Sequence, residues 1–160
     1  SLGSTFRCSF IVAPPNVIEV LERTAVLTLG QGDAVMQRML ADLINDGELK
    51  KHLRRVSTEY RRRRQTLLDC LHEAFGTLVS VQEPEGGLAL WVKFADSIDV
   101  DQLAAKALEL DLVVRGGRLF SPDGHPENAL RLGFASLDTD EIRRATQRLA
   151  QAARAIARQG

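Results

Sequence analysis

Cysteine and long apolar runs are scarce in this sequence of 160 residues, and each scarcity excludes a class of protein. The two cysteines, Cys8 and Cys70, make no disulfide framework, and their spacing fits no metal site. No apolar run reaches the roughly 18 residues that a membrane span needs, and the start lacks the pattern of a signal peptide. These absences favour a cytoplasmic protein with no membrane partner.

An excess of charge of either sign is also missing. Lysine and arginine together number 21, and so do aspartate and glutamate, so the net charge is zero. A dedicated nucleic-acid binder usually has a basic excess, so the charge argues against that class. Hydrophobic residues make up 44% and charged residues 26%, which is ordinary for a globular domain. The length suffices for one domain with a real core.

The first half of the sequence is predicted to be mainly helical. Residues 8–13 are a short apolar run closed by a proline pair, which predicts a strand. Asn16 is a candidate N-cap with Glu19 as its capping-box partner, for a helix over 17–27. Asp33 begins a second helix that ends at about residue 45. Residues 48–75 have apolar positions at spacings of three and four, which predicts one long amphipathic helix.

After Gly76 the apolar period changes from that of a helix to two, the period of a strand. Strands are expected over 78–81, 88–94, 112–114 and 129–135. Helices are expected over 100–110 and after a capping box of Asp138 and Glu141. The order predicts an α/β (α+β) fold: a small sheet covered by helices, preceded by a strand and a long helix. The first strand is isolated from the others, so we expect it to belong to a different sheet.

Three groups of motifs occur in a fixed order along the chain. The first is Ser1-Leu2-Gly3-Ser4-Thr5-Phe6-Arg7; the second is His52-Leu53-Arg54-Arg55 with Tyr60, Arg63-Arg64 and Leu67-Leu68; the third is Gly86-Gly87-Leu88 with Trp91, then Gly117-Arg118-Leu119-Phe120-Ser121, then Leu130-Arg131-Leu132-Gly133-Phe134-Ala135. Together they resemble the C-terminal part of the fold-type-I, class I and II aminotransferases, which use pyridoxal phosphate (PLP). The second group most resembles the MocR-type GntR regulators, which fuse a winged-helix domain to an aminotransferase-like one.

The resemblance implies a division of the chain and two site residues. Residues 1–15 would be a remnant of the large PLP-binding domain, and residues 16–160 the aminotransferase C-terminal small domain. Arg7 matches the family's arginine on the PLP phosphate, and Arg131 matches the arginine on the substrate α-carboxylate. A guanidinium suits both roles, because its planar fork donates two parallel hydrogen bonds to an anion. The family's PLP-binding lysine would lie before Ser1, so we expect no cofactor tightly bound to this chain alone.

Three functions are compatible with the resemblance. The first is the effector-binding or substrate-binding domain of a MocR-type, PLP-dependent transcription regulator. The second is the small domain of a genuine aminotransferase, and the third is a free-standing interaction domain. We expect the chain itself not to be an enzyme, whatever its parent does. The expected partners are an amino acid or amine, a second copy of the chain, and DNA only through a further N-terminal domain.

Simpler interpretations exist for the most conspicuous arginines. Arg131 lies among alternating apolar residues, so it could be an ordinary outward-facing strand residue. Residues 61–64 are four consecutive arginines, but consecutive residues on a helix point around its circumference and form no single stripe. A solvated face or ion pairs with acidic neighbours therefore explain that run better than contact with DNA.

Overall fold

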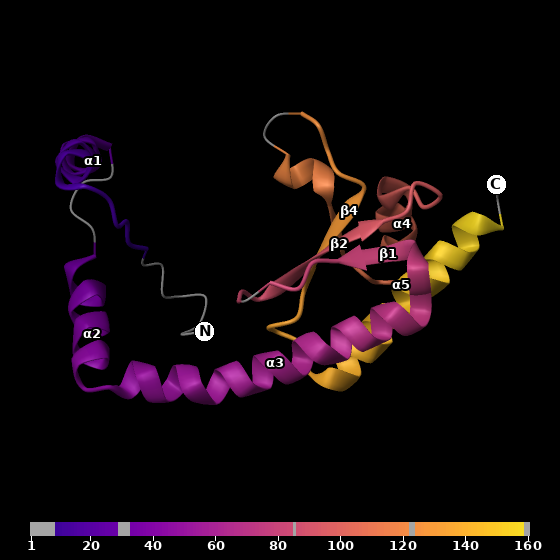
Figure 1. The fold of residues 1–160 in the computed structure, drawn as a ribbon, viewed down its shortest axis with the longest axis horizontal. Coiled ribbons are helices and arrows are strands. Elements are labelled where there is room, and N and C mark those ends of the chain that lie inside the picture. Colours follow the sequence, from indigo (N-terminus) through magenta and orange to yellow (C-terminus); the bar gives the residue numbers. More distant parts are fainter. Residues whose placement is uncertain (1–8, 29–32, 85, 122–123, 159–160) are drawn as a thin grey trace. The chain divides into compact units, whose positions relative to one another are not determined.

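The computed structural model describes residues 9–28, 33–84, 86–121 and 124–158 (Figure 1). The chain divides into two compact units, residues 1–57 and residues 58–160. Arg7 and Cys8 lie outside the described residues. Within the described part of the chain, every helix is too short or too polar to cross a membrane.

The first unit contains helices α1 (Pro15–Thr28) and α2 (Ala34–Asn45) and the start of α3 (Glu48–Phe75). Asp33 caps α2 as predicted, because its carboxylate accepts a hydrogen bond from the Met36 amide over 2.9 Å. Gly47 has a φ of 74°, which glycine adopts without strain, and it separates α2 from α3. All three helices predicted for this half of the chain are confirmed.

The N-terminal end of α1 differs from the prediction. The helix begins at Pro15, one residue before the proposed N-cap Asn16, which is therefore inside the helix. Proline is favoured in the first turn of a helix because its missing N–H would have no intrahelical partner there. The capping box of Asn16 and Glu19 was wrong for this reason; Glu19 instead accepts a hydrogen bond from Arg23 over 2.6 Å.

The strand predicted over residues 8–13 is not formed in its described part. Residues 9–13 have no regular secondary structure, and Phe10, Ile11 and Val12 are exposed. A strand needs a neighbour to receive its backbone hydrogen bonds. The strands that the structure describes pair with one another in the second unit, so the apolar run has the composition of a strand without a pairing partner.

The second unit is built on a four-stranded antiparallel sheet. Its strands are β1 (Val79–Val81), β2 (Ala89–Phe94), β3 (Arg115–Gly116) and β4 (Ala129–Gly133), in the spatial order β1-β2-β4-β3. The remaining elements are the second part of α3, helices α4 (Val100–Leu108) and α5 (Thr139–Ala157), and the 3-10 turns η1 (Gly76–Leu78) and η2 (Gly117–Phe120). The predicted fold class, a small sheet with helices packed on it, is confirmed.

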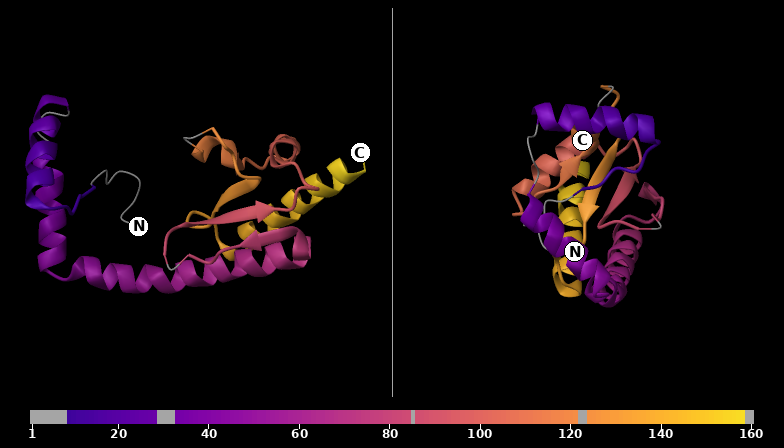
Figure 2. Two further views of the ribbon diagram at one scale, coloured as in Figure 1. Left: turned by 45° about the horizontal axis from the view of Figure 1, so that its top comes forward. Right: turned by 90° about the vertical axis from the view of Figure 1, so that its left-hand side faces the viewer.

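Alternation along the strands places the core on one face of this sheet. Leu90 and Val92 of β2 and Leu130 of β4 are fully buried, and they pack in one cluster with apolar residues of α3, α4 and α5. Figure 2 shows α3 and α5 along the same side of the sheet. Burial of each such side chain contributes about 1.5–3 kcal/mol. The alternate residues of β2 and β4, among them Trp91 and Arg131, lie on the opposite face.

The third predicted strand is displaced along the sequence. It was expected over residues 112–114, whereas β3 consists of Arg115 and Gly116. The Leu112 amide donates to the Ala107 carbonyl at the end of α4, so its backbone is held by the helix instead of the sheet. This local hydrogen bond at the end of α4 overrides the β propensity of the apolar run.

The capping box before α5 is confirmed in both directions. The Asp138 carboxylate accepts from the Asp140 and Glu141 amides, and the Glu141 carboxylate accepts from the Asp138 amide. At α4, Asp99 also caps the helix, but the Gln102 side chain donates to the Asp99 carboxylate, and no capping box forms. Both caps fix the point at which the chain leaves the sheet and enters a helix.

Candidate ligand-binding face of the sheet

Arg131 lies in the middle of β4, on the face of the sheet away from the core. It is directly opposite Trp91 on β2 and directly opposite Arg115 on β3. Residues that face each other across an antiparallel pair project from the same face, so these three form a row across the sheet, here called the Arg131 row. Trp91 is half-buried, while both arginines are exposed. The structure thus places Arg131 outward, where its guanidinium can meet a ligand.

An aromatic pair orients the arginine. Phe120 of η2 packs edge-on against Trp91, with ring centroids 5.7 Å apart and an interplanar angle of 86°. The guanidinium carbon of Arg131 lies 5.8 Å from the centroid of the Phe120 ring, within the range of a cation–π contact worth about 0.5–1 kcal/mol at an exposed site. No acidic side chain among the described residues pairs with Arg131, so the N–H groups of this guanidinium remain available to an anion.

Glu127 pairs with two residues of β2 on the same face of the sheet. Its carboxylate accepts from the Trp91 indole nitrogen and from the Lys93 ammonium, each over 2.6 Å. These charge-assisted bonds, led by the one from Lys93, hold the pKa of Glu127 below its ordinary value. Lys93 and Glu127 therefore neutralise each other beside the Arg131 row.

Gly117 explains how η2 reaches this face. A side chain at this position would collide with the backbone carbonyl oxygen of Glu127. Only glycine permits this close approach of two backbone segments. Gly117, the first residue of the motif, is thus required for packing. Its close approach to Glu127 brings Phe120 of the same motif against Trp91 and Arg131.

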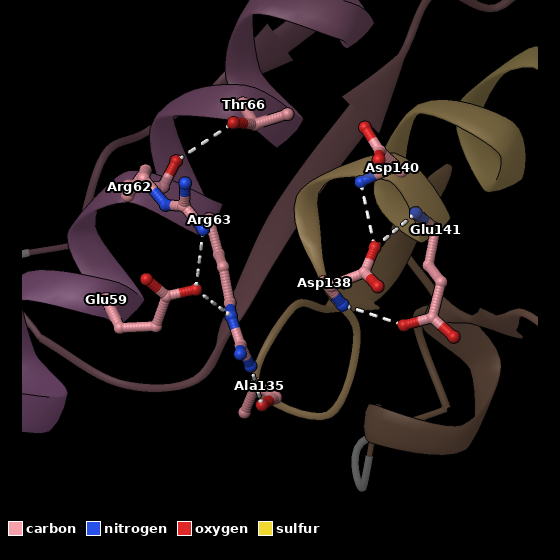
Figure 3. A network of polar contacts seen from close by, with 8 residues as sticks. All are labelled: Glu59, Arg62, Arg63, Thr66, Ala135, Asp138, Asp140 and Glu141. Carbon is pink, nitrogen blue, oxygen red and sulfur yellow. Dashed lines mark hydrogen bonds and ion pairs between the residues drawn. The ribbon is translucent and has the colours of Figure 1, made fainter.

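Two arginines of the long-helix motif join α3 to the loops at the ends of the sheet. Arg63 donates to Glu59 over 2.9 Å and to the Ala135 carbonyl over 2.6 Å (Figure 3). Arg64 donates to the Pro84 carbonyl over 2.7 Å. Arg63 and Arg64 are mostly buried, whereas Arg62 is exposed and pairs with Glu59. Half of the arginine run therefore has a structural role, and the interpretation as ion pairs and solvated surface holds for Arg62.

Arg115, Glu127 and Asn128 belong to none of the motifs in the sequence. Asn128 precedes β4 and donates to the carbonyls of Phe94, Ala95 and Ile98, while its side-chain oxygen accepts from the Val100 amide. A half-buried asparagine that satisfies four backbone groups fixes the turn between β2 and α4. No local pattern in the sequence marks it, because its partners lie about 30 residues away.

The family model described as aminotransferase class I and II matches residues 2–149. The chain belongs to this family. Its match includes the whole described sheet, the Arg131 row and both arginines that anchor α3.

Curated relatives of the family include enzymes and regulators. The 2-aminoadipate transaminase of Thermus thermophilus is 27% identical over 97% of this chain and 39% of its own length. The "Probable rhizopine catabolism regulatory protein MocR" of Rhizobium meliloti is 25% identical over the whole chain and 32% of its own length. The HTH-type transcriptional regulator TauR of Rhodobacter capsulatus is 24% identical over 96% of the chain and 32% of its own length.

Solved structures agree with this assignment. LysN, the α-aminoadipate aminotransferase of Thermus thermophilus, complexed with N-(5'-phosphopyridoxyl)-L-leucine, superimposes with a TM-score of 0.83 at 26% identity, over 93% of this chain and 38% of that one. The chain thus spans about two fifths or less of the relatives that it matches.

The residues of this chain fit only part of a PLP site. Three of its four lysines have carboxylate partners: Lys51 with Glu48, Lys93 with Glu127 and Lys106 with Glu109. Lys50 lies on α3, in the other unit from the Arg131 row. The guanidinium of Arg131 is suited to bind a carboxylate. Arg7, which matches the family's arginine on the PLP phosphate, lies outside the described residues.

Proposed function

We propose that this chain is the ligand-binding small domain of a PLP-dependent, MocR-type transcription regulator, and that Arg131 binds the α-carboxylate of an amino acid. The supporting observation is the environment of Arg131: an exposed guanidinium in contact with Phe120, with no carboxylate partner among the described residues. Such a group donates a bidentate pair of hydrogen bonds to a carboxylate.

In the intact protein, residues 16–160 would form the small domain, and residues 1–15 would belong to the large domain. PLP, when bound, acts as an electron sink for the amino compound attached to it. Arg7 would hold its phosphate, and Arg131 would orient the ligand by its carboxylate. We also infer a homodimer, and contact with DNA only through a further N-terminal domain.

A second candidate function is amino-group transfer, which the name of the 2-aminoadipate transaminase describes for that relative. The regulator is favoured by the motif of His52-Leu53-Arg54-Arg55 and Arg63-Arg64, and by relatives that are named as regulators. The intact protein distinguishes the two. A regulator changes its affinity for operator DNA when the amino acid is added, whereas an aminotransferase releases a 2-oxo acid.

The carboxylate role of Arg131 can be tested on this chain without the cofactor. Trp91 is its only tryptophan and lies beside Arg131, so its fluorescence reports ligand binding at this face. We expect valerate to change the emission, and Arg131→Leu to weaken that binding about tenfold or more, since a charge-assisted hydrogen bond contributes about 1.5–3 kcal/mol.

The matched control is Arg118→Leu, which removes a nearby guanidinium that is already paired with Asp101 over 3.1 Å. It should leave valerate binding within twofold of the unsubstituted chain. Equal loss in the two variants would show that only general charge attracts the ligand, and unchanged binding in Arg131→Leu would contradict the proposal.

A further inference from the structure

The strands and η2 together carry four cationic side chains, and they fall into two kinds. Lys93 is paired with Glu127 over 2.6 Å, and Arg118 is paired with Asp101 over 3.1 Å. Arg115 and Arg131 have no acidic partner among the residues that the structure describes. Like charges directly opposite each other in an antiparallel pair destabilise it, so this pair of arginines costs the fold stability unless an anion is bound.

The spacing of the two arginines defines the anion. Directly opposed residues have Cβ atoms about 4.5–5.5 Å apart, and repulsion separates two unpaired guanidinium groups further. The fork of one guanidinium makes a bidentate pair of hydrogen bonds with one planar carboxylate. A chain of five carbons has four bonds of about 1.5 Å each. Because an extended chain is a zigzag, its two carboxyl carbons lie roughly 5 Å apart, and it offers one carboxylate to each arginine.

Aromatic rings lie beside the two cations on this face of the sheet. Phe120 packs against Trp91 and lies 5.8 Å from the guanidinium carbon of Arg131. Two cations beside apolar rings match a ligand with two anionic groups and an aliphatic body. A ligand with a single carboxylate would leave one guanidinium without a bidentate partner.

We propose that Arg115 is a specificity-determining residue that binds the distal carboxylate of a dicarboxylic ligand, while Arg131 binds its α-carboxylate. This inference rests on the proposed function of Arg131. It assigns to the site the class of acidic amino acids with a short aliphatic chain. The motifs that carry the resemblance do not contain Arg115, which lies two residues before the Gly117-Arg118-Leu119-Phe120-Ser121 motif.

Glutarate and valerate provide a matched pair of probes, because both have five carbons and they differ by one carboxylate. We expect Trp91 fluorescence to show about tenfold tighter binding of glutarate by the unsubstituted chain, as one added charge-assisted hydrogen bond predicts. Arg115→Leu should abolish this preference while valerate binding stays within twofold. Arg115→Lys should restore part of the preference, since it returns the charge without the fork.

The outcomes separate the two proposals. Loss of both ligands in Arg131→Leu, with the glutarate preference intact in Arg115→Leu, would overturn the role of Arg115 and leave that of Arg131. A preference that Arg118→Leu abolishes equally would reduce the effect to general charge and overturn the inference. If the unsubstituted chain binds neither glutarate nor valerate at concentrations up to about 0.1 M, which is close to physiological ionic strength, both proposals are wrong. Circular dichroism of each variant confirms that the fold is retained.

Discussion

Glu127 couples the ligand-binding face to pH. It accepts hydrogen bonds from Trp91 and Lys93, and these lower its pKa from an ordinary value of 4.5. A carboxyl with a lowered pKa in the folded state contributes stability above its unfolded pKa, and this contribution is lost as the pH falls through the folded value. The pH dependence of this residue therefore belongs to the acid range, below 4.5.

Titration of Trp91 fluorescence measures this coupling. Protonation of Glu127 weakens its bond from the indole nitrogen, so we expect a step in the emission with a midpoint below pH 4.5. Glu127→Gln should remove the step while the emission of Trp91 remains that of a folded protein. A midpoint above 4.5, or a step that survives in Glu127→Gln, would contradict the hydrogen-bond assignment.

At the level of residues, the sequence motifs predicted Arg131, but they did not predict residues that depend on how the strands pair. Arg131 was predicted from its motif, and its outward direction followed from strand alternation. Arg115 could not be predicted, because the strand was expected over 112–114 and its true register against β4 depends on hydrogen bonds to α4. Asn128 was missed for the same reason, since its four backbone partners are distant in sequence.

Among the elements, α3 depends on Arg63 for its position against the sheet. This side chain is only 21% exposed, and it joins Glu59 on the helix to the Ala135 carbonyl just after β4 (Figure 3). We expect Arg63→Leu to lower the free energy of unfolding by about 1–3 kcal/mol, because it leaves a partly buried carbonyl and a carboxylate without their partner. Urea denaturation measures this change.

Arg62→Leu is the matched control on the same helix. Its guanidinium also pairs with Glu59, but its side chain is 63% exposed, and exposed ion pairs contribute about 0–1 kcal/mol. The control should shift the unfolding free energy by less than half as much as Arg63→Leu. Equal shifts would mean that Glu59, and not the bond to Ala135, anchors the helix.

The helices were the most predictable elements because their signals are local. The apolar period, the cap at Asp33 and the capping box at Asp138 each lie within a few residues of the helix that they define. The strands were less predictable because a strand is completed by a partner. Residues 9–13 have apolar composition and no partner strand among the described residues, and β3 is displaced from the apolar run that was expected to form it.

On the scale of the whole molecule, the core belongs to one of the two units. The buried hydrophobic residues of the described chain run from Leu67 to Ala152, all within residues 58–160. Helices α1 and α2 contain no buried residue among those described, and apolar side chains such as Val20, Leu27 and Val35 are exposed. A large exposed apolar surface is typical of an interface, which agrees with the proposed second copy or the large domain of the intact protein as its cover.

Hydrogen exchange of the chain at low concentration tests this division. Helices of 14 and 12 residues are marginal without tertiary packing, so the amides of α1 and α2 should open with free energies near zero. Those of β2, β4 and α5 should approach the global value, about 5–15 kcal/mol for a typical domain. Protection of α1 and α2 that rises with protein concentration would indicate that a second copy covers them. Strong protection at every concentration would contradict the division, because these helices would then be stabilised within a single chain.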